Sequence, residues 1–263
     1  MPSYCSVTDL KTYLGVTPSG DDVLIQLMLD AATNRIDSFT GRTFQAAADE
    51  TRYFDPTESV DDGMLNLDAD LSYITSVING DGTDIVNYVY PRPRNLTPYY
   101  QLGIRSSAPY QWEISATDTQ DSIDITGRWA WMDRANITAL ARTTNVVTAT
   151  VKAPRVSVGA SVFIVGCADT SFNGTFTVVS NTGSAITWAQ TAANDTDTTA
   201  TLLHTPTDIV AACRRLGAWA YRQKDTQQGD SDRPILVGDG TIIMPSTLPA
   251  DVTSLLRAYV KRM

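Results

Sequence analysis

The chain has 263 residues, of which 43% are hydrophobic, so it is long enough for one large domain or two modest ones with a real core. It has no run of 18 apolar residues and no signal-peptide pattern at its N-terminus, so we expect neither a membrane span nor export, and we place its synthesis in a cytoplasm. Three widely separated cysteines and a single histidine argue against a disulfide framework and a zinc site, and we expect buried free thiols.

The net charge of −9 is unevenly distributed. Residues 1–142 hold 10 Lys and Arg against 20 Asp and Glu, residues 143–203 hold 2 against 3, and residues 204–263 hold 8 against 6. An acidic body repels nucleic acid at long range, so we expect no sequence-specific DNA binding. The basic excess lies at the C-terminal end.

Two consecutive helices are predicted near the N-terminus. The first begins after Ser6, whose hydroxyl can cap it, and ends at Gly15. The second begins near Asp21 or Asp22, either of which can cap it, and ends at Gly41. Apolar residues recur along it in steps of three and four, which puts them on one face: Ile25, Leu29, Ala32, Ile36 and Phe39. Such a hairpin is not stable alone, so the rest of the chain must cover this face.

From residue 51 the period changes to that of strands, and a β-meander is predicted. The turn-rich sequence at 68–70 is expected to end one strand, and the Asn-Gly-Asp-Gly sequence at 79–82 to form a hairpin turn. We interpret the acidic residues at 79–84 as part of this turn rather than as a calcium loop, because no Glu follows at the required spacing. The predicted strands are 51–54, 64–67, 71–79, 85–90, 110–114 and 122–131.

A proline-rich stretch interrupts this region and interleaves arginine with tyrosine, at Arg92, Arg94, Tyr99 and Tyr100. These residue types stack on bases in single-strand binding proteins, and they are also enriched at protein interfaces. Because the surroundings are acidic, we favour an exposed loop that contacts protein.

Residues 143–203 are rich in Thr, Val, Ser and Gly and almost without charge. Apolar residues alternate in four short runs, which predicts a small closed β-barrel or sandwich with strands at 146–151, 161–165, 174–179 and 185–188. The sequence at 172–178 resembles a segment of small β modules in phage structural proteins. One open alternative is that this module binds a carbohydrate or a capsid partner, with Trp188 as a stacking platform.

Helical periodicity returns after this module. A helix predicted over 205–225 has the apolar stripe Ile209, Cys213, Leu216 and Ala220. Arg214 and Arg215 lie off that stripe, on a face that is either solvated or a partner surface. A hairpin is predicted at 235–244 and a last helix at 250–261. The last helix combines an apolar face at Val252, Leu255, Leu256 and Tyr259 with basic residues at Arg257, Lys261 and Arg262.

The two ends of the chain resemble the head-tail connector (adaptor) family of tailed phages. The resemblance rests on the order of several segments: 7–15, 36–44, 51–54, 65–68, 206–209 with Trp219 and Tyr221, and 248–256. It implies an α+β fold, in which an N-terminal helix pair, C-terminal helices and a β-meander form a connector domain of residues 1–142 and 204–263. Residues 143–203, which the small members of the family lack, form an inserted β domain.

The resemblance further implies a structural virion protein of the neck, made in the bacterial host cytoplasm. Copies assemble as a dodecameric ring beneath the portal protein, extend the DNA channel used in genome packaging and ejection, pass double-stranded DNA without reading its sequence, and offer a docking platform to the next neck protein. We assign portal contact to Leu255, Arg257, Tyr259, Lys261 and Arg262, and ring or neck contacts to Arg92, Arg94, Tyr99, Tyr100, Arg214 and Arg215. Deletion of 249–263 is expected to abolish portal binding and leave folding intact.

Other functions are weighed against this one. We expect no enzyme, cofactor or metal, because the chain has one histidine, His204, and cap and turn chemistry already explains its Asp pairs at 21/22 and 61/62. A stopper or tail-completion protein lower in the neck is an alternative, which would not form a ring directly on the portal.

Overall fold

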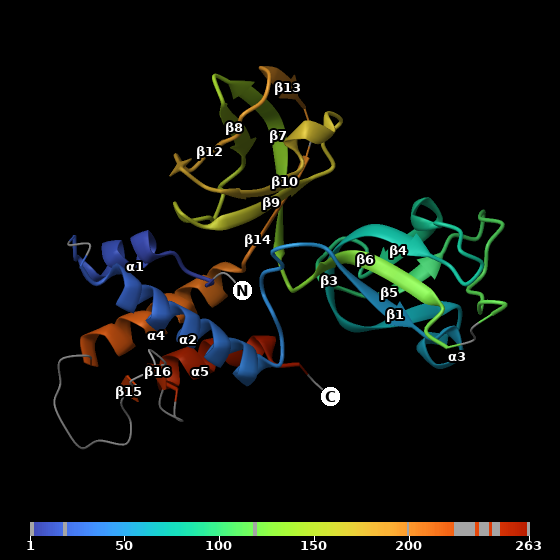
Figure 1. Ribbon diagram of the computed structural model, residues 1–263, viewed down its shortest axis with the longest axis horizontal. Coiled ribbons are helices and arrows are strands. Elements are labelled where there is room, and N and C mark those ends of the chain that lie inside the picture. The colour runs from blue at the N-terminus through green and yellow to red at the C-terminus, as the bar shows by residue number, and fades with distance from the viewer. Residues whose placement is uncertain are drawn as a thin grey trace. The chain divides into compact units, whose positions relative to one another are not determined.

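The computed structural model describes residues 3–17, 20–117, 120–198, 200–223, 235–236, 242–243 and 248–261. It has a mixed α+β fold with antiparallel sheets, which confirms the predicted class. The chain divides into two compact units (Figure 1). The first unit is Met1–Phe44 with Arg134–Met263, and the second unit is Gln45–Asp133.

The first unit contains a helical bundle. Its helices are α1 (Val7–Leu14), α2 (Asp22–Thr40), α4 (Thr207–Gln223) and α5 (Ala250–Leu256), and a 3₁₀ turn, η3 (Arg257–Tyr259), follows α5. Helix α4 packs against α1, α2 and α5, so helices from both ends of the chain share an apolar interior (Figure 1). Eight of the nine residues in the predicted stripes are fully buried: Ile25, Leu29, Ala32 and Ile36 on α2, and Ile209, Cys213, Leu216 and Ala220 on α4. The ninth, Phe39 near the end of α2, is only half-buried.

Local sequence decides where α1 and α2 begin and end. The Oγ of Ser6 accepts a hydrogen bond from the N–H of Asp9 at 3.1 Å, and Gly15 ends α1 with a φ of 70°, as predicted. Asp21 is the N-cap of α2, but the predicted cap hydrogen bond is absent. Instead, the Oδ2 of Asp21 accepts a hydrogen bond from the Tyr221 hydroxyl at 2.6 Å, which joins the start of α2 to the end of α4.

Gly217 lies in the middle of α4, where glycine costs about 1 kcal/mol relative to alanine. A Cβ atom at this position would lie 3.0 Å from the Cδ2 atoms of Leu10 and Leu29. Because glycine has no side chain, α1 and α2 approach α4 closely at this point.

The last helix is shorter than predicted. Helix α5 ends at Leu256, and after η3 the chain turns extended at Val260, so that the N–H of Lys261 donates to the carbonyl of Thr40 at 2.8 Å. This bond satisfies a carbonyl of the last turn of α2. It uses the N–H of Lys261, so this bond competes with a continuation of α5. Between α4 and α5, β15 (Ile235–Leu236) pairs antiparallel with β16 (Ile242–Ile243), which confirms the predicted hairpin for the four residues described there.

The second unit is built on one antiparallel sheet. Its elements are β1 (Glu50–Phe54), α3 (Pro56–Ser59), β2 (Val60–Asp61), β3 (Met64–Ile78), η1 (Val86–Tyr88), β4 (Val89–Arg92), β5 (Tyr99–Ile104) and β6 (Ile123–Trp129). The strand order is β1-β6-β3-β5-β4, with β2 paired to β3. The predicted meander is therefore wrong in strand order, because β6 lies between β1 and β3. Strands β1 and β4 are at opposite edges (Figure 1).

The long strand β3 explains this difference. The turn predicted at 68–70 is an irregularity inside one strand of 15 residues, whose register against β5 shifts between Asn66 and Leu71. The first half of β3 pairs with β5 and the second half with β6, so one strand serves two partners. Two further predictions are wrong: residues 85–90 form η1 and the start of β4, and residues 110–114 are not a strand.

The first unit also contains an antiparallel sheet of eight described strands. They are β7 (Asp133–Thr143), β8 (Val146–Val151), β9 (Ser161–Val165), β10 (Gly174–Thr177), β11 (Ser180–Asn181), β12 (Ala185–Ala189), β13 (Asp195–Asp197) and β14 (Ala200–His204), with the 3₁₀ turn η2 (Thr170–Phe172) between β9 and β10. The order is β10-β9-β14-β7-β8-β12-β11, with β13 paired to β7. The predicted strands within 143–203 are confirmed, and β7, which precedes them, lies at the centre of the sheet.

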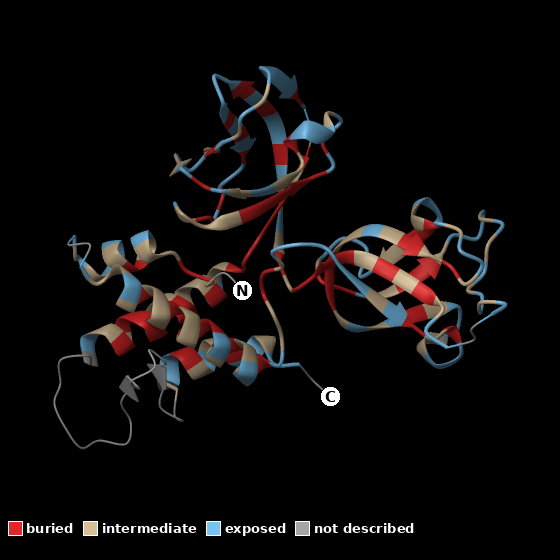
Figure 2. Cartoon of the chain, in the orientation of Figure 1, coloured by how far each residue is buried: buried red, intermediate tan, exposed pale blue. Residues whose placement is uncertain are grey.

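This sheet curls around its own core, shown by the buried interior positions in Figure 2. Phe176 on β10 stacks on Trp188 on β12 with ring centroids 5.1 Å apart, although these strands are not paired in the sheet. Trp188 is 0% exposed. The prediction that it forms a stacking platform for a carbohydrate is therefore wrong, because its indole fills the core.

Candidate docking surface

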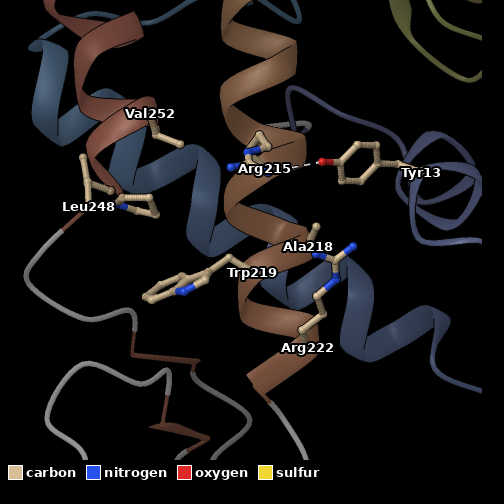
Figure 3. A pocket seen from close by; sticks show the side chains of 8 residues that line it. Tyr13, Arg215, Ala218, Trp219, Arg222, Leu248 and Val252 are labelled. Carbon is tan, nitrogen blue, oxygen red and sulfur yellow. Dashed lines mark hydrogen bonds between the residues drawn. The ribbon is translucent and has the colours of Figure 1, made fainter.

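A pocket opens on the surface of the helical bundle, between α4, α1 and the start of α5 (Figure 3). Its volume is about 380 Å³. The lining is apolar and aromatic with two guanidinium groups, and consists of Tyr13, Arg215, Ala218, Trp219, Arg222, Leu248, Pro249 and Val252. Tryptophan, tyrosine and arginine are the residue types that dominate binding energy at protein interfaces. The pocket is therefore a candidate docking surface for a protein partner.

Arg215 holds one wall of the pocket. Its Nε donates to Oδ2 of Asp251 at 2.9 Å, and its Nη1 donates to the Tyr13 hydroxyl at 3.4 Å (Figure 3). The guanidinium therefore lowers the pKa of Tyr13 and the pKa of Asp251, since it stabilises the anionic form of each. These contacts fix α4 against α1 and α5, and they neutralise the charge of Arg215.

Arg214, next along α4, is also used within the bundle. Its Nη1 lies 3.4 Å from Oδ1 of Asp9, and its Cζ lies 5.2 Å from the centroid of the Tyr13 ring. Both arginines predicted to make ring or neck contacts thus bind other helices of the same chain. Whether they also contact a partner stays a prediction.

Trp219 and Arg222 complete the pocket. Trp219 is half-buried and projects from α4 toward Leu248 and the start of α5, and Arg222 is exposed one turn further along α4 (Figure 3). Within the described part of the chain, Arg222 forms no ion pair. The pocket therefore offers an aromatic surface beside a positive charge that has no ion-pair partner among the described residues. This combination suits an apolar side chain that is followed by a carboxylate.

The predicted portal-contact residues lie at the end of the same bundle. Arg257 and Lys261 are exposed and Leu255 is half-buried, whereas Arg262 lies outside the described residues. Tyr259 is half-buried, because its ring packs on Phe44 and its hydroxyl donates to Oδ2 of Asp208 at 3.2 Å.

These packing contacts overturn the expectation that the bundle folds without residues 249–263. Val252 is 2% and Leu256 0% exposed in α5, so deletion would uncover the bundle interior. A test of portal contact therefore has to substitute exposed residues rather than delete this segment.

The predicted contact loop belongs to the second unit, between β4 and β5. Arg92, Arg94 and Tyr100 are exposed there, as expected for a protein-contacting loop. Tyr99 is not: it is 7% exposed and belongs to the core of the sheet, because side chains alternate between the two faces of β5.

Sequence reasoning missed Trp219, Arg222 and Tyr13 as parts of one pocket. The sequence did contain one indication of this pocket: Trp219 lies off the apolar stripe of α4, on a side of the helix where a large aromatic residue would be exposed unless something covered it. Only the packing of α1 and α5 beside α4 shows that Tyr13 and Leu248 meet it.

No cluster of three or more metal-ligating side chains occurs among the described residues. The described helices are each too short or too polar to span a bilayer. All three cysteines are buried thiols.

The α+β fold and the pocket on the helical bundle are the features with which the comparisons are combined here. Residues 4–80 match the family model of phage gp6-like head-tail connector proteins. The match confirms the predicted head-tail connector resemblance and supports a structural role in a virion. It spans α1 and α2 of the first unit and the second unit through β3. A search of curated proteins found no match.

Proposed function

We propose that the protein is a head-tail connector (adaptor) whose copies form a ring beneath the portal of a tailed phage, extend the DNA channel and carry the next neck protein. The family match over residues 4–80 carries this proposal. The pocket beside Trp219 and Arg222 supports a role in docking, because its lining is of the interface type. The connector domain in this proposal is residues 1–142 and 204–263, with 143–203 as an inserted β domain.

Portal contact is assigned to the α5 side of the bundle. Leu248, Pro249 and Val252 line the pocket at the start of α5, and exposed Arg257 and Lys261 follow at its other end. Residues 248–261 thus contribute both to the pocket lining and to the exposed positive charge. A portal surface that presents carboxylates beside an apolar side chain would complement it.

Co-sedimentation with purified portal rings tests the proposal. Trp219→Ala with Arg222→Glu, and separately Arg257→Glu with Lys261→Glu, are each expected to weaken portal binding about tenfold or more, since aromatic and charged contacts buried at an interface are worth about 1.4 kcal/mol and above. Lys152→Glu with Arg155→Glu is the matched control, because both residues are exposed between β8 and β9, in the eight-stranded sheet and not in the helical bundle. Unchanged binding by both test variants would refute the assignment to this surface.

Electron microscopy of the same mixtures distinguishes the connector from a stopper. A connector adds a ring directly to bare portal. If the protein binds only to portal that already carries another neck protein, the stopper or tail-completion function is correct instead.

The curled sheet of the first unit keeps open a second function, recognition of a capsid or carbohydrate partner. A shallow hollow of about 570 Å³ lies on it, lined by Asn136, Ile137, Thr138, Gly166, Thr198, Ala200 and Thr201. This test requires the whole protein, because a 143–203 fragment would lack all but the last residue of β7, the strand at the centre of this sheet. Binding of the intact protein to a glycan array or to capsid shells would support this second function.

A further inference from the structure

The net negative charge of the protein comes from one unit. The second unit, residues 45–133, holds 5 Lys and Arg against 15 Asp and Glu, a net charge of −10, whereas the first unit holds 15 against 14. A unit this acidic repels copies of itself unless opposite charges meet at specific places. The positions of its few arginines are therefore informative.

Two of the five arginines are neutralised within the unit. Arg52 contacts Glu50 at 3.3 Å and Asp68 at 3.2 Å, and Arg128 contacts Asp49 at 2.5 Å. The other three, at positions 92, 94 and 105, are exposed and form no ion pair within the described part of the chain. Arg92 and Arg94 lie at the loop end of the β4–β5 hairpin, and Arg105 directly follows β5 at the other end. All three therefore lie on the β4 side of the sheet.

The loop of this hairpin also presents an apolar residue. Leu96 is 68% exposed between Arg94 and the start of β5. The loop is held to the rest of the unit, because the Thr97 hydroxyl donates to the carbonyl of Met132 at 2.7 Å. We call Arg92, Arg94 and Leu96 the basic tip.

The side of the same sheet away from β4 has the complementary character. Tyr53 on the edge strand β1 is 62% exposed. Glu58, Asp61 and Asp62 are exposed in the α3–β2 segment that follows, and β2 pairs with β3 on the side opposite β5. None of these three acids forms an ion pair within the residues that the structure describes. We call Tyr53, Glu58, Asp61 and Asp62 the acidic edge.

We propose that the basic tip of one copy docks on the acidic edge of a second copy. Arginines and carboxylates that have no ion-pair partner among the described residues would then meet each other, and Leu96 would meet the exposed ring of Tyr53. Because the two surfaces lie on opposite sides of β3 in one sheet, the contact is head-to-tail, and repeated head-to-tail contacts close into a ring when the rotation between copies allows it. This inference rests on one part of the proposed function, namely that neighbouring copies of a connector contact each other in a ring.

Charge exchange between the two surfaces tests the proposal. The tip variant carries Arg92→Glu and Arg94→Glu, and the edge variant carries Glu58→Lys and Asp61→Lys. Self-association is measured by sedimentation over a range of concentrations, and by the number of copies bound per portal ring. Each variant alone is expected to associate about tenfold or more weakly than the unchanged protein, since like charges then face each other.

The diagnostic result is recovery. An equimolar mixture of the two variants, and a chain that carries all four substitutions, both restore opposite charges at every contact, so association is expected to return to within about threefold of the unchanged protein. Lys152→Glu with Arg155→Glu controls for net charge, because it changes the charge by the same amount as the tip variant. Variants that associate normally, or a mixture that fails to recover, would overturn the proposal.

Two other outcomes are separable. If the tip variant loses binding to single- or double-stranded DNA while self-association is unchanged, the arginines form a nucleic-acid surface and the proposal is wrong. If no form of the protein binds portal but charge exchange still controls self-association, the proposed function fails and this inference stands. If portal is occupied by independent single copies, the inference fails and portal docking stands.

Discussion

The ring of Tyr259 meets the ring of Phe44 edge-on, with centroids 5.5 Å apart and planes at 82°. Phe44, which is 0% exposed, meets the ring of Tyr4 in the same way at 5.8 Å. One aromatic side chain therefore joins the segment before α1, the end of α2 and the segment after α5. The bundle depends on both ends of the chain at this point.

Removal of the Tyr259 ring is expected to destabilise the bundle. Tyr259→Ala should lower the free energy of unfolding by about 1–2 kcal/mol, because it removes a half-buried aromatic pair. Tyr259→Phe keeps the ring and removes the hydroxyl with its exposed hydrogen bond to Asp208, so a loss below about 1 kcal/mol is expected. Urea unfolding followed by helical circular dichroism measures both. Equal losses in the two variants would show that the hydroxyl, not the ring, matters.

Overpacking at Gly217 is expected to separate α4 from its neighbours. Gly217→Val places methyl groups where even a Cβ atom lies 3.0 Å from Leu10 and Leu29, so we expect a loss of about 1–3 kcal/mol. Ala211→Val, at a half-buried position of the same helix, controls for the helix propensity of valine. The prediction is wrong if both variants unfold at the same denaturant concentration.

The helical bundle is expected to lose stability at alkaline pH, because it buries groups that ionise there. Burial raises the pKa of Cys213 to about 12 and raises the pKa of Tyr4 and of Cys5. A group with a raised pKa stabilises the folded state below its ordinary pKa, and this contribution is lost as the pH rises toward the folded value. The ordinary pKa of cysteine is near 9, so stability should fall above about pH 9.

Thermal unfolding across pH 7 to 11 measures this dependence. Cys213→Ala is expected to flatten the decline of the bundle's stability. Cys167→Ala is the control. Burial raises the pKa of the Cys167 thiol to about 11, but this thiol lies in the core of the curled sheet. The stability of the helical bundle should therefore fall with pH as steeply in this variant as in the unchanged protein. A slope that Cys213→Ala leaves unchanged would show that the buried thiol is not responsible.

Truncation of Trp188 is expected to unfold the curled sheet. Trp188→Ala removes a fully buried indole that stacks on Phe176, and we expect a loss of about 3–5 kcal/mol. Val179→Ala, at a position that is 60% exposed, should cost less than about 0.5 kcal/mol. The change in near-ultraviolet circular dichroism on heating reports the transition. A stable Trp188→Ala protein would contradict the packing described here.

The sequence by itself determined the helices, most strands and the connector resemblance. Helix stripes such as Ile25 to Ile36, and stops such as Gly15 and Gly41, depend on spacing and on backbone conformation, which are local properties. Only the tertiary structure decided what these elements meet. The break predicted at 68–70 became part of β3, because pairing with two partner strands outweighs a local turn preference. Likewise Trp188 is a core residue and Trp219 a pocket residue, because burial depends on which segments distant in sequence pack beside each side chain.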